Sequence, residues 1–153
     1  MPKCYQLIGV PGSGKSTWIA NQEWAKDCVV VSTDNYVENF ARESNKTYNE
    51  VFKEFMPIAV DLMAADVVRA RTEGKDIIWD QTSTTVASRR RKFNMLPDYE
   101  HIAVVMKIPP EEKLIMRLAS RPKKYIPWQA VSDMLNNFEM PSESEGFVEI
   151  WYT

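Results

Sequence analysis

Short apolar runs rich in β-branched residues recur along the chain, and segments with helical spacing of apolar residues lie between them. The runs predict strands at 5–8, 28–31, 76–79 and 102–108. Strands that alternate with helices are typical of a parallel sheet covered by helices on both faces. The pattern therefore predicts an α/β fold with a mostly parallel central sheet.

The expected helices are recognised by apolar spacing and by the residues at their ends. Residues 15–25 have the composition of a helix, and apolar residues recur at helical spacing from Tyr48 to Met63. Pro57 interrupts the second pattern, which predicts a kink there or two helices that meet. Gly74 suits the end of this segment. Another helix is expected at 110–119, where a proline and two glutamates suit a helix N-terminus.

The segment 120–128 is basic and aromatic and contains proline, so we expect an exposed loop that could act as a mobile lid. Pro127 is expected to open a further helix that runs to about Phe138. Residues 146–152 alternate between apolar and polar, as a half-buried strand does. No internal repeat, low-complexity segment or second domain is evident, so 1–153 is interpreted as one domain.

Composition narrows the interpretation only slightly. A chain of 153 residues with 44% hydrophobic content can form one domain with a proper core. The net charge of −2 and the pI near 5.5 give no overall signature of a nucleic-acid binder, so a polynucleotide would need a local basic groove. Cys4 and Cys28 lie in or beside apolar strands without metal spacing or a disulfide framework, which favours a reducing cytosol. Neither a signal peptide nor a membrane-spanning apolar run is found, and we expect no membrane partner.

One motif carries the strongest chemical information. Between the first expected strand and the first expected helix stands Gly9-Val10-Pro11-Gly12-Ser13-Gly14-Lys15-Ser16, which fills every fixed place of the phosphate-binding loop G-x-x-x-x-G-K-[ST]. Its glycines let backbone N–H groups close around phosphates, and the helix N-terminus adds its positive end. Lys15 would reach the β- and γ-phosphates, and the Ser16 hydroxyl would hold Mg²⁺. The motif predicts binding of a nucleoside triphosphate.

The loop alone does not separate kinases, GTPases, motor ATPases and binding switches. The chain has neither an Asn-Lys-x-Asp motif nor an Asp-x-x-Gly after the third strand, which weakens the GTPase interpretation. Large oligomeric ATPases need a longer chain. A small kinase fits the length, and it should carry a catalytic carboxylate, a carboxylate on the metal side and mobile arginines.

Two aspartates follow expected strands, at the edge where open α/β sheets bind their ligands. Asp34 follows the second strand, where a carboxylate can orient an attacking hydroxyl and take its proton. Capping of a following helix is an equally good interpretation of Asp34. Asp80 closes the third strand in the form of a Walker B element, which favours holding Mg²⁺ through water or orienting the acceptor side. A simple turn at the strand end is the alternative for Asp80.

Basic residues cluster in two places. Arg117 and Arg121 would face the same way on a continuing helix, and over a triphosphate they would neutralise charge on the transferred phosphoryl group. A solvated basic face is the alternative, but the neighbouring lid-like loop favours a functional role. The run 89–92 points around its expected helix, so we expect a solvated surface from which one or two residues could touch an acceptor phosphate.

Trp18, Trp24 and Phe93 are expected to pack in the core, as most aromatic residues do. Tyr36 and Trp128 are the exceptions, since they lie beside the proposed catalytic segments and could stack a base or sugar. His101 is the only histidine and has no evident catalytic partner, so we expect a structural role.

With these elements in order, the chain resembles the polynucleotide kinase family, specifically the kinase domain of the T-even phage 5′-kinase and its P-loop relatives. The resemblance spans nearly the whole chain. It rests on the segments 11–18, 32–36, 78–82 and 116–121, on Pro127 with the helix after it, and on 145–147. The loop motif is generic to P-loop proteins, whereas the later segments in this order are more specific.

The resemblance implies a single P-loop kinase domain with a basic lid. By that resemblance ATP and Mg²⁺ are the cofactors, and the metal is held by Ser16 and Asp80. Asp34 activates a 5′-hydroxyl of DNA or RNA, and Arg121, with Arg117, clamps the phosphates. The implied nucleotide-binding residues are Gly12, Ser13, Gly14, Lys15, Ser16, Thr17, Arg117 and Arg121. It is also compatible with a phage origin and with the host cytoplasm as the place of action.

Two departures from the family lie on the acceptor side. This chain has Val37 where the phage enzyme has an arginine that grips the acceptor phosphate, and Ser83 where the family often has asparagine. A kinase with another acceptor therefore stays open, such as a hydroxymethylated base in phage-type DNA, a nucleoside or a sugar. A nucleotide-binding switch without transfer activity is the other alternative, and Asp34 speaks against it because a pure binder needs no carboxylate near the γ-phosphate.

Overall fold

Five strands pair only in parallel and form one sheet in the order β2-β3-β1-β4-β5, in a computed structural model that describes residues 1–153. The sheet is built outward from β1, with β3 paired on one side and β4 on the other. The chain therefore adds strands first on one side of β1 and then on the other. At such a switch in strand order a crevice forms at the carboxyl ends of the strands, where open α/β sheets bind ligands. The strands are β1 Lys3–Ile8, β2 Val29–Val31, β3 Ile77–Trp79, β4 Glu100–Val105 and β5 Phe147–Tyr152.

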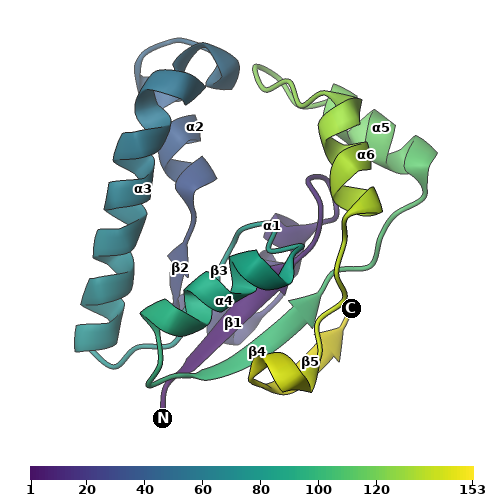
Figure 1. Cartoon of the computed structure of the whole chain (residues 1–153). Helices are drawn as coiled ribbons and strands as arrows, with labels where there is room; N and C mark the ends of the chain where they lie inside the picture. Colours follow the sequence, from purple (N-terminus) through teal and green to yellow (C-terminus); the bar gives the residue numbers. More distant parts are fainter.

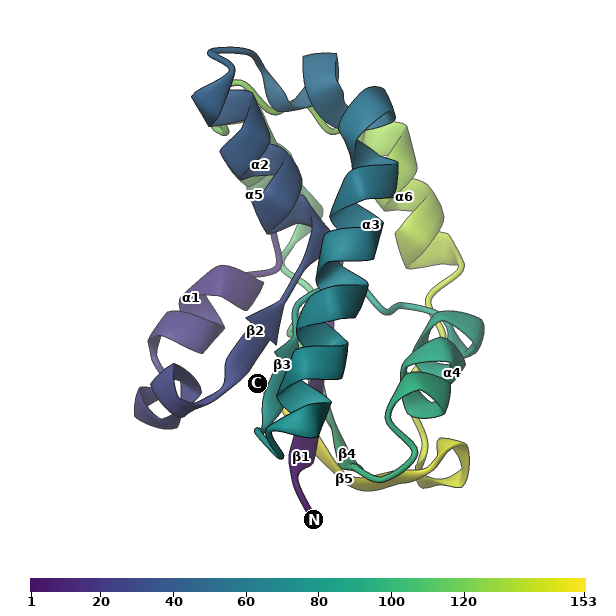
Figure 2. The same ribbon diagram turned by 90° about the vertical axis from the view of Figure 1, so that its left-hand side faces the viewer.

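Helices cover both faces of the sheet and extend beyond its carboxyl edge (Figure 1). They are α1 Lys15–Ala20, α2 Thr33–Glu43, α3 Tyr48–Thr72, α4 Val86–Met95, α5 Glu111–Ala119 and α6 Trp128–Asn136, with 3₁₀ turns at Glu23–Asp27 and Glu143–Glu145. The pair α2–α3 stands on one side above the strand ends and the pair α5–α6 on the other. Figure 2 shows α1 and α4 on opposite sides of the sheet. None of the helices is long and apolar enough to cross a membrane.

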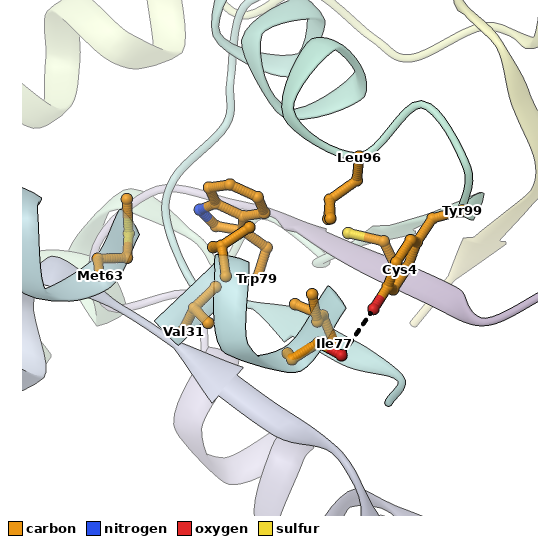
Figure 3. Close-up of a cluster of buried hydrophobic side chains, with 9 residues drawn as sticks. Cys4, Val31, Met63, Ile77, Trp79, Leu96 and Tyr99 are labelled. Atoms are coloured by element: carbon orange, nitrogen blue, oxygen red, sulfur yellow. Dashed lines mark hydrogen bonds between the residues drawn. The ribbon is translucent and has the colours of Figure 1, made fainter. Parts of the chain in front are cut away.

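Alternate side chains of β1 enter two different cores. Cys4 packs on the face of α3 and α4, in a cluster that is shown in Figure 3 with Trp79 and Tyr99. Tyr5 and Leu7 pack on the opposite face, where α1 and the 3₁₀ turn after it add partly buried tryptophans. This two-sided burial explains why the strands are continuous apolar runs. The predicted α/β fold with a parallel sheet and helices on both faces is confirmed.

Several predicted boundaries need correction. The helix predicted at 15–25 ends at Ala20, where Asn21 is the C-cap and a 3₁₀ turn follows at Glu23–Asp27. The strand predicted at 102–108 ends at Val105. The helices at 111–119 and 128–136 and the last strand at 147–152 agree with the predictions to within two residues.

Pro57 lies inside one helix, so the alternative of two helices that meet there is wrong. A proline inside a helix removes one backbone hydrogen bond. Tertiary packing offsets that loss, because Val51 before the proline and Ala59 after it lie in the same buried cluster. In that cluster they pack against Val37 and Ala41 of α2. The contact with α2 therefore stabilises the long helix across the proline.

The basic run at 89–92 is only half solvated, which corrects the prediction of a solvated surface. Arg90 and Arg91 are exposed, but the Arg89 side chain is fully buried and the Lys92 residue is 5% exposed. The Arg89 Nε lies 2.8 Å from Glu145 Oε1, and its Nη1 donates to the carbonyl of Ser83 at 2.9 Å. The Lys92 Nζ donates to the Ser88 carbonyl at 3.2 Å, and burial lowers the pKa of Lys92 to about 8. The two buried cations therefore support the fold.

The buried pair of Arg89 and Glu145 leads to a stability prediction. Glu145→Ala leaves the Arg89 guanidinium buried without a counter-charge, so the free energy of unfolding should fall by about 3–5 kcal/mol. Urea unfolding measures this change in the free energy of unfolding. The matched control is Glu143→Ala in the same turn, where the side chain is exposed and little change is expected. A loss from Glu145→Ala of less than about 1 kcal/mol, as for a surface ion pair, would contradict a structural role for the pair.

Candidate active site

A cavity of about 680 Å³ lies at the carboxyl edge of the sheet, between the loop after β1, the start of α2, the end of β3 and the segment after α5. All the residues predicted from the sequence to bind nucleotide or metal, or to act in catalysis, line this one cavity. These residues are Gly12, Ser13, Gly14, Lys15, Ser16, Thr17, Asp34, Asp80, Arg117 and Arg121. The topology therefore brings together residues that are more than a hundred positions apart.

The glycine-rich loop adopts a backbone that needs glycine at two positions. Gly12 has φ +83° and Gly14 has φ +95°, both in the left-handed region. A Cβ at Gly12 would also come within 3.3 Å of Leu114 Cδ2 of α5, so the loop lies close against that helix. The Gly9 N–H donates to the carbonyl of Thr82 at 2.9 Å, which ties the loop to the segment after β3.

The Lys15 ammonium lies at the centre of the charged groups of the cavity. Its Nζ donates to the carbonyls of Gly9 at 3.0 Å and Val10 at 3.1 Å. Burial lowers the pKa of Lys15 to about 8, and the carboxylates of Asp80 and Asp34 act in the opposite direction. Arg121 is among the cations that lower this pKa further. Both carboxylates and cations therefore lie close to Lys15 and to the phosphate loop.

Asp80 stands at the end of β3, as its Walker B interpretation requires. Its backbone N–H donates to the carbonyl of Val31 at 2.9 Å, which continues the pairing of β2 and β3 by one residue. Burial raises the pKa of the Asp80 carboxyl, and the nearby Lys15 ammonium acts against that rise. The carboxylate therefore lies beside the phosphate loop in a partly desolvated position.

Asp34 does not cap the helix that follows β2. The cap is Ser32, whose hydroxyl accepts the N–H of Asn35 at 3.2 Å. The Asp34 carboxylate instead faces the cavity, where its Oδ1 accepts the Tyr48 hydroxyl at 2.7 Å and its Oδ2 lies 3.5 Å from Lys124 Nζ. Its side chain remains 52% exposed, so an incoming hydroxyl can reach it. Between the interpretations of Asp34 as a helix cap and as a catalytic base, this geometry favours the base.

Arg117 and Arg121 line the cavity but have different surroundings. Helix α5 ends at Ala119, so the two arginines do not share a continuous helix as predicted. The Arg117 Nη1 donates to the carbonyl of Gly12 at 2.8 Å and so supports the phosphate loop. The Arg121 guanidinium makes no hydrogen bond or ion pair within the chain and points its charge at the same cavity.

The segment after α5 contributes to the cavity wall and is hydrogen-bonded to the start of α3; in Figure 1 it extends towards the α2–α3 pair. The Tyr48 N–H donates to the carbonyl of Lys123 at 2.8 Å, and the Asn49 side chain makes two hydrogen bonds with the backbone of Tyr125. Lys124 Nζ lies 2.7 Å from Glu38 Oε1. Sequence reasoning missed Glu38 and Tyr48, and it could not distinguish Lys123 from Lys124 within a basic loop. Mobility of this lid stays a prediction.

The two aromatic residues predicted to stack a base lie elsewhere. The Tyr36 hydroxyl donates to Asp66, and Trp128 packs against the cluster of Val10 and Leu114. Neither lines the cavity, whereas Trp18, expected only in the core, does. His101 has the predicted structural role: its Nε2 donates to the Leu96 carbonyl at 2.9 Å, and burial lowers its pKa.

The donor groups of the cavity fit a nucleoside triphosphate with Mg²⁺. The buried Ser13 hydroxyl has no hydrogen-bond partner in the chain and belongs to the cavity wall, which suits a phosphate oxygen. The chain has no group of three or more His, Cys, Asp or Glu that could hold a metal by itself. Mg²⁺ is usually bound by one or two carboxylates together with substrate phosphates, and the cavity offers Ser16 and Asp80 for this.

A family model for the AAA domain matches residues 6–141. The chain belongs to this AAA domain family. The bifunctional polynucleotide phosphatase/kinase of Schizosaccharomyces pombe is 24% identical over 149 residues, which cover 94% of this chain and 31% of that protein. This chain therefore spans about a third of the length of that relative.

Solved structures agree with the fold of a P-loop kinase. The Pnkp1/Rnl/Hen1 RNA repair complex contains a chain with TM-score 0.64 and 23% identity, covering 89% of this chain and 43% of that one. A sugar kinase from Janibacter sp. has TM-score 0.60 and 17% identity, covering 99% and 86%. The fold is thus shared by a chain of an RNA repair complex and by a sugar kinase, and it does not single out the phage-type family.

Lys15→Ala should abolish nucleotide binding. The ammonium would make charge-assisted hydrogen bonds to two phosphates, so the Kd for ATP with Mg²⁺ should rise about 100-fold or more. Isothermal titration calorimetry measures it, with the exposed Lys26→Ala of the neighbouring 3₁₀ turn as a matched control. Unchanged affinity in the Lys15 variant would show that the loop is not the nucleotide site.

Proposed function

We propose that this chain is an ATP-dependent kinase that transfers the γ-phosphate to a hydroxyl of a nucleic acid, in the first place the 5′-hydroxyl end of DNA or RNA. The observation that carries the proposal is the half-exposed Asp34 carboxylate on the wall of the cavity that contains the phosphate loop. A nucleotide-binding switch has no need for such a group. The polynucleotide relative and the RNA repair complex support a nucleic-acid acceptor.

In the proposed reaction, the loop and Lys15 bind the β- and γ-phosphates. Asp34 accepts the proton of the acceptor hydroxyl, and the freed oxygen attacks the γ-phosphorus. The bond from the γ-phosphorus to the bridging oxygen breaks, and ADP leaves with the electron pair. Arg121 neutralises charge that spreads over the transferred group. When bound by Ser16 and Asp80 together with the phosphates, Mg²⁺ supplies further charge neutralisation.

A second candidate acceptor is a hydroxyl of a nucleoside, a sugar or a hydroxymethylated base. One observation favours it. Val37, at the position of the acceptor-gripping arginine in the phage enzyme, is fully buried between α2 and α3 and is absent from the cavity wall. The likeness to a sugar kinase is in keeping with a small acceptor.

The test is transfer of labelled γ-phosphate from ATP with Mg²⁺ to a panel of acceptors. The panel contains 5′-hydroxyl DNA, 5′-hydroxyl RNA, hydroxymethyluracil DNA with blocked ends, and free nucleosides. We expect label at the 5′-end of a polynucleotide. Label only on the modified base or the nucleoside would support the second candidate and overturn the first. Binding of ATP without transfer to any acceptor would overturn both.

A further inference from the structure

The lid carries one lysine to a fixed place at the start of α2. The residues on either side of Lys124 are both tied to α3: the Lys123 carbonyl accepts the Tyr48 N–H at 2.8 Å, and the Tyr125 backbone pairs with the Asn49 side chain at 2.7 and 2.8 Å. The backbone on both sides of Lys124 is therefore fixed against α3, and this places the Lys124 side chain over the start of α2. It is 9% exposed.

The charge of Lys124 is already compensated within the protein. Its Nζ lies 2.7 Å from Glu38 Oε1 and 3.5 Å from Asp34 Oδ2. The ammonium also lies 4.3 Å from the centre of the Tyr48 ring, an arrangement that stabilises a cation. A new anion would have to compete with two carboxylates for this ammonium, and Glu38 is the closer of them.

Charge is divided between the two ends of the cavity. Beside the phosphate loop lie the cations of Lys15, Arg117 and Arg121 and the carboxylate of Asp80, and Asp34 is near enough to act on Lys15. At the start of α2, the carboxylates of Asp34 and Glu38 face the single cation of Lys124, and no other lysine or arginine lines the cavity. The first end therefore attracts phosphates, and the second end repels them.

We infer that the acceptor subsite, which on the proposed function lies beside Asp34, makes no use of a phosphate next to the reacting hydroxyl. Glu38 determines this specificity, because its ion pair with Lys124 occupies the one cation that lies beside Asp34 at the start of α2. The acceptor is held instead through neutral hydroxyl, sugar or base groups, for which the cavity wall offers the amide of Asn35. A 5′-hydroxyl end is then recognised by its terminal nucleoside and not by its 3′-phosphate.

The test compares two acceptors that differ only in that phosphate, thymidine and thymidine 3′-monophosphate. The measured quantity is the ratio of their kcat/KM values for 5′-phosphorylation. For the natural chain we expect a ratio near one. Glu38→Gln removes the closer of the two carboxylates from the Lys124 ammonium, and a charge-assisted hydrogen bond to the phosphate should then raise the ratio by about tenfold or more. Glu43→Gln is the matched control, since Glu43 lies on the same helix, is exposed and is not part of the cavity wall.

The outcomes separate this inference from the proposed function. A natural chain that prefers the 3′-monophosphate by about 100-fold would overturn the inference while supporting kinase activity. A ratio that stays unchanged in Glu38→Gln, in a variant that still binds ATP normally, would overturn the role of Glu38. No phosphorylation of thymidine, its 3′-monophosphate, 5′-hydroxyl DNA or 5′-hydroxyl RNA would overturn the proposed function itself.

Discussion

Arg121→Ala should lower kcat by roughly 10³-fold or more, the effect of an arginine that neutralises charge on a phosphoryl group in transfer. The guanidinium lines the cavity and makes no hydrogen bond or ion pair with the rest of the chain, so its charge is available to the reacting groups. Because the charge develops mainly in the transition state, the Kd for ATP should change much less than kcat. Single-turnover transfer and calorimetry measure the two quantities.

Arg117→Ala is the informative comparison for that variant. Arg117 donates to the carbonyl of Gly12 and so supports the loop itself, which predicts weaker ATP binding together with slower transfer. The exposed Arg90→Ala on α4 should leave both quantities unchanged. Equal losses of ATP affinity and turnover in Arg121→Ala would identify Arg121 as an anchor for bound nucleotide instead.

Asp34→Asn should reduce kcat by roughly 10²–10⁴-fold, which is the usual contribution of a general base. The amide has the shape of the carboxylate and can still accept the Tyr48 hydroxyl through its oxygen, but it cannot take a proton from the acceptor. ATP binding should be preserved, because the phosphate loop is unaltered. The measurement is transfer to the preferred acceptor of the panel, with ATP affinity measured on the same preparation.

Tyr48→Phe provides the matched control for Asp34. It removes the hydroxyl that donates to Asp34 Oδ1 at 2.7 Å and leaves the carboxylate in place, so a smaller loss of turnover is expected. Full transfer activity in Asp34→Asn would rule out the assignment of Asp34 as base. Loss of ATP binding in the same variant would instead indicate that the substitution disturbs the nucleotide site.

Local patterns were sufficient for most of the architecture. The phosphate loop, the strand ends at Asp34 and Asp80 and the alternation of strands with helices all depend on residues that are neighbours in the chain. Parallel strands carry their ligands at one edge, so the sequence could also predict that these residues meet. Boundaries were less predictable, as at Ala20, where a cap and a 3₁₀ turn replace the last part of the expected helix.

The sequence by itself determined the fold class and the phosphate loop, aspartates and arginines of the cavity, because motif and periodicity act over short distances. Tertiary structure alone decided which charges are buried and paired. Arg89 meets Glu145 over a separation of 56 residues, and Lys124 meets Glu38 over 86. From the sequence alone, the basic segments at 89–92 and 120–128 could equally well be exposed to solvent. The free energy of a charge depends on burial and on its partner, and only the folded chain supplies both.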